Sequence, residues 1–153
     1  MGALLMTIFR LLNEKADIER IESCINNDPA CVTSEIHSNS PGLSQMLSPL
    51  HVAVKRKRPD VVKLLLDKKA DPNKQATRIY GTDANFTPLT MAAIQPGGIE
   101  ILKLLLDNGG DPNAGFEFQE PLPQALLKTR EESTQQDLTE NIRLLLEYEG
   151  DPN

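Results

Sequence analysis

The sequence predicts an all-α solenoid of stacked helix-turn-helix units, because one structural plan recurs along the chain. Residues 48–73 read S-P-L-H-V-A-V-K-R-K-R-P-D-V-V-K-L-L-L-D-K-K-A-D-P-N, which indicates a short helix, a tight turn, a second helix with an apolar stripe and an extended exit. Residues 87–113 repeat this plan closely, and residues 120–153 repeat it with a longer middle. Such a period predicts a repeat array in which neighbouring units share one continuous core.

The shared motifs are S/T-P-L-H-x-A, an apolar second helix ending in L-L-L, and A/G-D-P-N. In this order they resemble the ankyrin repeat, most clearly over residues 48–153. The resemblance implies an ankyrin-repeat solenoid with long inter-repeat loops, and a chain of 153 residues has room for about four units of ~33 residues. It also implies a protein that binds other proteins and has no catalytic activity of its own.

We expect residues 1–153 to form a single ankyrin-repeat domain. Its parts are a degenerate capping repeat with a loop (1–47), a repeat (48–86), a second repeat (87–119) and a lengthened last repeat (120–153).

The first 47 residues predict two helices followed by a loop. Apolar residues at helical spacing indicate helices over residues 3–13 and 17–26, with polar residues on their other faces, as a terminal repeat needs for solubility. Residues 28–47 contain Asp-Pro and Ser-Asn-Ser-Pro-Gly without apolar periodicity, so we expect an enlarged loop there.

Helix-end signals in residues 48–73 support this plan. Pro49 fits the first helical turn and Ser48 the cap before it. The resemblance implies that His51 hydrogen-bonds neighbouring loops, which favours a structural role over a catalytic or metal-binding one. Lys69 takes the place of a family glycine with left-handed backbone, which predicts about 1 to 2 kcal/mol of strain. The next repeat keeps Gly109 there.

The later repeats carry insertions. One residue is added around residues 96–98. About eight more lie between Gln124 and Asn141, which predicts a lengthened helical hairpin whose second helix is capped by Ser133 or Thr134. The chain stops at an Asp-Pro-Asn that elsewhere leads into another repeat. This favours either a fragment of a longer protein or a last helix pair that closes the stack by its length.

Composition excludes several other classes of protein. No apolar run approaches the ~20 residues that span a bilayer, so no membrane insertion is expected. Cys24 and Cys31 are interpreted as buried thiols of a reducing compartment rather than a disulfide or metal pair. With His37 and His51 as the two histidines, no nucleophile and base pair can be assembled. We therefore expect no enzyme, no cofactor and no metal.

Charge divides the chain into unlike parts. Residues 55–78 hold nine basic and three acidic side chains, a balance of +6, whereas residues 79–153 hold four basic and thirteen acidic, a balance of −9. The run Lys55-Arg56-Lys57-Arg58 ends the first helix of its repeat. It is interpreted either as an anchor for an acidic or phosphorylated protein surface or as an ordinary solvated helix end. The run K-R-K-R-P also resembles a nuclear import signal. Nucleic acid is not expected as a partner, because the net charge of −6 over the whole chain opposes attraction to phosphates.

Four of the six aromatic residues lie in two inter-repeat loops, which here are called fingers. These rings are interpreted as anchors for a partner, or alternatively as a satellite core under folded-back fingers. By resemblance, nearby first-helix residues point into the concave face of the array. The predicted partner-binding residues are Lys55, Arg56, Arg58, Tyr80, Phe86, Ile94, Gln95, Phe116, Phe118 and Leu127.

The sequence thus predicts a monomeric protein-interaction module that displays a rigid concave face and fingers to another protein. Irregular repeats with long insertions resemble an adaptor or effector, intracellular and cytoplasmic, of the kind that intracellular bacteria deliver into host cells. Two alternatives are an inhibitor of a partner enzyme and the targeting domain of a larger enzyme truncated at residue 153.

Overall fold

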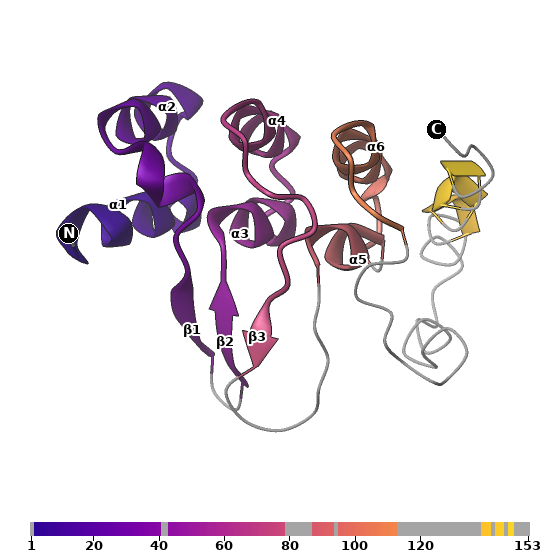
Figure 1. The fold of residues 1–153 in the computed structure, drawn as a ribbon, viewed down its shortest axis with the longest axis horizontal. Helices are drawn as coiled ribbons and strands as arrows, with labels where there is room; N and C mark the ends of the chain where they lie inside the picture. Colours follow the sequence, from indigo (N-terminus) through magenta and orange to yellow (C-terminus); the bar gives the residue numbers. More distant parts are fainter. Residues whose placement is uncertain are drawn as a thin grey trace.

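Helix pairs stack side by side along the chain. The computed structural model describes residues 2–40, 43–78, 87–93, 95–112, 139–141, 143–145 and 147–148. Its helix pairs are α1 (Gly2–Asn13) with α2 (Ile18–Asn27), α3 (Pro49–Lys55) with α4 (Pro59–Asp67), and α5 (Pro88–Ala93) with α6 (Ile99–Asp107). Figure 1 shows α1, α3 and α5 in one row and α2, α4 and α6 in a second row. The arrangement confirms the all-α repeat solenoid predicted from the sequence.

The segment between the first two pairs differs from the predicted loop. It contains a 3-10 turn, η1 (Pro29–Val32), and two antiparallel strands, β1 (Ile36–Ser40) and β2 (Leu43–Leu47). A short strand from the next finger, β3 (Thr77–Arg78), pairs with β2 and completes the order β1-β2-β3. The strands project away from the row of α1, α3 and α5 (Figure 1). The expectation of a loop over residues 28–47 was therefore wrong, because backbone pairing across and between fingers needs no apolar periodicity.

The core is a thin layer that runs through all three pairs. In α4 the apolar spacing buries Val61, Val62, Leu65 and Leu66, and α6 buries the matching residues Ile101, Leu102, Leu105 and Leu106. Each fully buried side chain of this size contributes roughly 1.5 to 3 kcal/mol. Helix α3 is buried from its first residue to Val54, because α1, α4, α5 and β2 all contact it. Its last residue, Lys55, is exposed.

Side chains three residues apart close the starts of α3 and α5. Ser48 N donates to Nδ1 of the fully buried His51 at 3.3 Å, and Ser48 Oγ lies 2.8 Å from the same atom. In α5, Thr87 N donates to Thr90 Oγ1 at 2.9 Å, and Thr90 N donates to Thr87 Oγ1 at 3.2 Å. Histidine and threonine therefore serve the same purpose in two repeats, satisfying backbone groups that have no partner inside the helix.

Left-handed backbone recurs where the helices turn and where they end. The turn of each pair contains one such residue, Lys15 (φ 53°), Lys57 (φ 53°) and Gly97 (φ 68°). After α4 and α6 the same conformation is found at Lys69 (φ 67°) and Gly109 (φ 85°). The left-handed conformation predicted for Lys69 is thus confirmed, and lysine adopts it at a cost that glycine avoids.

Polar side chains link one helix pair to the next near the ends of α2, α4 and α6. Lys68 Nζ donates to Asn26 Oδ1 at 2.8 Å. Asn73 Nδ2 donates to Gly109 O at 2.9 Å, and Asn73 Oδ1 accepts from Asp111 N at 2.7 Å. The Asp-Pro-Asn exit of one repeat is therefore hydrogen-bonded to the backbone of the corresponding exit in the next.

Helical residues of the last repeat lie against α5 and α6. Residues 139–141, 143–145 and 147–148 are helical, and both Asn141 and Leu144 are buried. Asn141 Nδ2 donates to Ala93 O at 3.1 Å, at the end of α5. Asn141 thus satisfies a carbonyl that the helix itself leaves unpaired. The cap predicted at Ser133 or Thr134 lies outside the described residues.

Candidate partner-binding surface

The basic turn, defined here as Lys55, Arg56, Lys57 and Arg58, joins α3 to α4. Arg56 closes α3, Lys57 takes the left-handed conformation that reverses the chain, and Arg58 precedes Pro59 at the start of α4. The first three residues of the turn are exposed, whereas Arg58 is partly buried. Four consecutive cations are thereby displayed on a single tight turn.

The basic turn hydrogen-bonds to the turns on both sides of it. Arg56 Nη2 donates to Asn13 Oδ1 at 2.6 Å, and Arg58 Nη1 donates to Ala16 O at 3.0 Å, both in the first helix pair. Lys57 Nζ donates to Pro96 O at 2.9 Å in the third pair. These contacts hold the side chains of Arg56, Lys57 and Arg58, so the positions of these three are set before any partner arrives.

Among the described residues, one charge of the basic turn, that of Arg58, is balanced by an acidic side chain. Arg58 forms a bidentate pair with Asp60, with nitrogen-oxygen distances of 3.0 and 2.6 Å. Hydrogen bonding from Arg58 lowers the pKa of Asp60, and hydrogen bonding to Asp60 raises the pKa of Arg58. By contrast, Arg56 and Lys57 donate to a neutral amide and a neutral carbonyl, which leave their charges uncompensated.

Lys55 differs from the rest of the turn in having no polar contact. Its side chain is exposed, and it makes no hydrogen bond or ion pair with the part of the chain that the structure describes. Lys55, Arg56 and Lys57 therefore form a group of three uncompensated cations. The sequence-based set of binding residues contained two of them and omitted Lys57, although the K-R-K-R run already contained that signal.

Among the other predicted binding residues, the structure describes Gln95, which is half-buried after α5. The backbone carbonyl oxygen of Gln95 lies 3.5 Å from Asn141 Nδ2. The remaining predicted positions lie outside the described residues: Tyr80, Phe86, Ile94, Phe116, Phe118 and Leu127.

Three of the side chains considered for chemistry, those of Cys24, Cys31 and His51, lie in the core. His51 is fully buried and occupied with the start of α3. Cys24 and Cys31 are free and buried, and burial raises the pKa of both thiols, that of Cys31 to about 11. Thiols of this kind stay protonated and unreactive at neutral pH. Within the described ranges, no three His, Cys, Asp or Glu side chains lie close enough to hold a metal ion.

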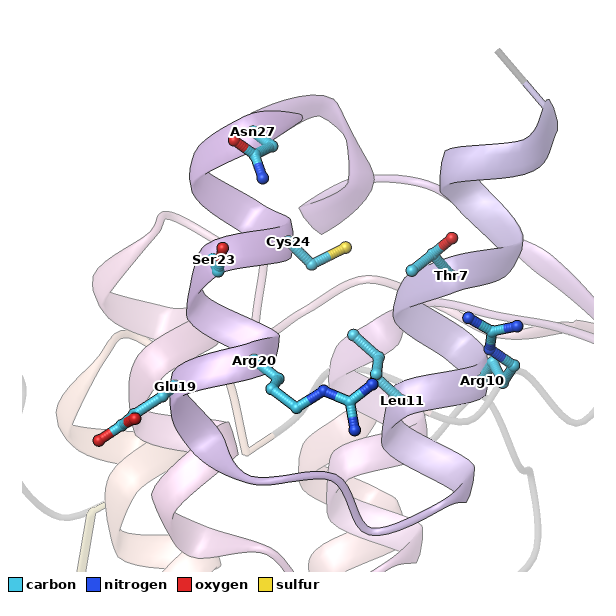
Figure 2. Close-up of a pocket in the computed structure, with 8 residues that line it drawn as sticks. All are labelled: Thr7, Arg10, Leu11, Glu19, Arg20, Ser23, Cys24 and Asn27. Atoms are coloured by element: carbon cyan, nitrogen blue, oxygen red, sulfur yellow. The ribbon is translucent and has the colours of Figure 1, made fainter.

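A groove of about 400 Å³ lies between α1 and α2 (Figure 2). Thr7, Arg10 and Leu11 of α1 line it together with Arg20, Ser23 and Cys24 of α2. Its lining carries charges of both signs, from Arg10 and Arg20 and from Glu19. Arg10 also pairs with Glu14 at 3.9 Å. No sequence motif pointed to this groove, since its residues are spread over two helices.

Comparison with protein families agrees with this geometry. A family model described as ankyrin repeats, in three copies, matches residues 21–115, which is more than half of the chain. The chain belongs to the ankyrin-repeat family. A comparison with individual curated proteins gave no match.

Membership in the ankyrin-repeat family bears on function at a general level. Ankyrin repeats are generally protein-protein interaction modules and are typically not catalytic. Among the described residues, no helix is long and apolar enough to cross a membrane.

Proposed function

We propose that this ankyrin-repeat protein is an adaptor or effector that binds an acidic or phosphorylated surface of another protein. The observation that carries the proposal is the group of three uncompensated cations, Lys55, Arg56 and Lys57, on the basic turn. Two of them are held in place by neutral acceptors from neighbouring repeats. Arg58, whose charge Asp60 balances, belongs to the site as the residue that anchors the turn to Ala16.

A fixed cationic turn favours binding for two physical reasons. Side chains that are already ordered lose less conformational entropy on docking, at a saving of roughly 0.5 to 1.5 kcal/mol for each immobilised side chain. Clustered like charges also steer an oppositely charged partner and raise its rate of association, an effect that salt weakens. Cations at a helix end whose side chains move freely in solvent would not have this saving in conformational entropy.

The aromatic fingers complete the proposed surface. In this proposal the rings anchor the partner beside the basic turn, and the first-helix residues between them line the concave face. The proposed residues beyond the turn are Tyr80, Phe86, Ile94, Gln95, Phe116, Phe118 and Leu127. The chain is proposed to act as a monomer inside a cell, in the cytoplasm or delivered there from a bacterium, and its free thiols agree with a reducing compartment.

Charge reversal at Lys55 tests the role of the turn. Lys55→Glu removes a cation that has no structural contact, so the fold should be unaffected. Lys63→Glu is the matched control, because Lys63 is exposed on α4, also lacks a polar contact, and changes the net charge equally. Proteins captured from lysate by the wild-type chain are identified, purified and titrated against all three chains. We expect about a tenfold loss of affinity for Lys55→Glu, equivalent to about 1.4 kcal/mol.

Equal affinities of the Lys55→Glu and Lys63→Glu chains would refute the role of the turn. If both variants weaken binding equally and only at low salt, net charge alone would explain the attraction. An assay of any enzymatic activity of the captured protein, made in the same titration, distinguishes an inhibitor from an adaptor.

The fingers are tested separately by a triple variant, Phe86→Ala with Phe116→Ala and Phe118→Ala. Circular dichroism first establishes that it folds as the wild type does. Loss of the partner from the folded variant would support the fingers as anchors. Unchanged capture would show instead that the rings serve the fold and that binding depends on the turn.

A further inference from the structure

Tyr148, a helical residue of the last repeat, contacts α6. Tyr148 is 37% exposed, and its hydroxyl donates a hydrogen bond to Asp107 Oδ1 at the end of α6. The hydrogen bond to the carboxylate raises the pKa of the Tyr148 phenol. The phenol is therefore a neutral donor at physiological pH, and its hydroxyl lies at the molecular surface.

The surroundings of this hydroxyl are acidic. Asp107 accepts from it, and Glu147, the preceding residue, is exposed. In the sequence, Glu149 and Asp151 follow closely. The tyrosine thus presents negative charges on both sides, which suits an enzyme with a basic substrate cleft.

The contact belongs to a segment that lies against α5 and α6. Asn141 donates to Ala93 O, Leu144 is buried, and Tyr148 makes the contact nearest the end of the segment. Among the described residues, the bond between Tyr148 and Asp107 is the one polar side-chain contact that holds the end of this helix to α6. A change at the hydroxyl therefore acts directly on this attachment.

We propose that Tyr148 is a phosphorylation site for a protein tyrosine kinase and that its phosphorylation releases the end of the last helix from α6. In the reaction, the Tyr148 Oη attacks the γ-phosphorus of Mg-ATP, the bond to the β,γ-bridging oxygen breaks, and ADP leaves. The phenolic proton passes to the catalytic base of the kinase. This proposal concerns a different surface from the basic turn and does not depend on it.

Release follows from the charges that the modification brings together. A phosphotyrosine has no hydroxyl proton to donate, so the hydrogen bond to Asp107 is lost. It also carries a charge of about −1.5 to −2 and is repelled by the carboxylate of Asp107, which accepted the lost hydrogen bond. Among the described residues, no Lys or Arg forms a hydrogen bond or ion pair with Asp107 or Tyr148 that would balance the new charge.

The first test uses the fact that the chain contains two tyrosines, Tyr80 and Tyr148. The whole chain is incubated with a promiscuous tyrosine kinase domain and Mg-ATP, beside the single variants Tyr80→Phe and Tyr148→Phe. We expect the Tyr80→Phe chain to gain one phosphoryl group by mass spectrometry and the Tyr148→Phe chain to gain far less. Modification of Tyr80 with none at Tyr148 would overturn the proposal.

The second test separates release from modification. Phosphotyrosine is placed at position 148 by semisynthesis, and amide exchange is followed over α6 and residues 143–148. We expect about a tenfold faster exchange there than in the unmodified chain. In the Asp107→Asn background the same phosphotyrosine should speed exchange much less. Unchanged exchange, or equal acceleration in both backgrounds, would refute electrostatic release.

Discussion

The pair α3/α4 and the pair α5/α6 have nearly the same core but unlike edges. Their second helices bury matching apolar positions, with Leu65 in one and Leu105 in the other fully buried. At the edges, the turn of α3/α4 has Lys57 where the turn of α5/α6 has Gly97. After the second helix, α3/α4 has Lys69 where α5/α6 has Gly109. The comparison shows that the buried positions match between the two pairs, whereas the residue types at the turns and helix ends vary.

The two lysines with left-handed backbone show different uses of the same strain. Lys57 reaches Pro96 O in the next turn and contributes an uncompensated charge to the basic turn. The side chain of Lys69 makes no polar contact with a described residue. Strain at Lys57 is thus accompanied by a side-chain contact with the next turn, whereas strain at Lys69 is accompanied by no side-chain contact among the described residues.

The largest expected effect tests whether the two cores are equivalent. Leu65→Ala and Leu105→Ala each leave a cavity at a site with no exposed surface, and each should cost about 2 to 5 kcal/mol of stability. Urea denaturation of the two variants measures this. Costs that differ by more than a factor of two would show that one pair dominates the stability of the array.

A smaller effect tests whether histidine and threonine are interchangeable at the helix start. His51→Ala removes both a buried ring and the acceptor for Ser48 N, and should cost about 2 to 4 kcal/mol. His51→Thr restores the arrangement seen at Thr87 and Thr90 and should recover about 1 kcal/mol of that loss. Thermal melts of both variants decide the matter. If threonine recovers nothing, the ring matters for packing and not for the cap.

Replacing the strained lysines with glycine sharpens the contrast between them. Lys69→Gly should raise stability by about 0.5 to 1 kcal/mol, because the relief of left-handed strain exceeds the added chain entropy. Lys57→Gly gains the same relief but loses the bond to Pro96 O, worth about 0.5 to 1.5 kcal/mol, so little net change is expected. Equal gains for both variants would mean that the Lys57 contact adds no stability.

The smallest expected effect is on the stability of the fold at low pH. Because Arg58 lowers the pKa of Asp60, this pair stabilises the fold above the unfolded-state pKa of about 3.9, and the contribution is lost as pH falls through the lower folded value. Asp60→Asn should make stability less dependent on pH in that range, by no more than about 1 kcal/mol for so exposed a pair. Glu100→Gln is the control from α6, where Gly98 replaces the arginine. Equal pH profiles for Asp60→Asn and the wild type would refute the coupling.

Repeating motifs made the helix pairs predictable, because the apolar period and the Pro at the starts of α3 and α5 are local signals. The left-handed Lys69 was predictable for the same reason, through its alignment with Gly109. The strands β1 and β2 were not, since their pairing depends on backbone hydrogen bonds that also involve β3 from another finger. Residues 36–40 have no apolar period that would have indicated this pairing.

The candidate surface was predictable as a set of residues but not as an arrangement. The run of cations from Lys55 to Arg58 is plain in the sequence. Which charge is balanced depends on distances between turns, as in Arg58 with Asp60 and Ala16. The groove between α1 and α2 and the contact of Tyr148 with Asp107 likewise join residues that no local pattern connects.

Several bonds between repeats end on a backbone carbonyl or amide of the neighbour. Asn73 contacts Gly109 O and Asp111 N, Arg58 contacts Ala16 O, and Lys57 contacts Pro96 O. Every residue type except proline offers both of these backbone groups. A neighbouring unit can therefore change most of its own side chains, or be exchanged for a related unit, without losing these joints. Mutation and duplication can diversify the surface of such an array while its assembly stays intact.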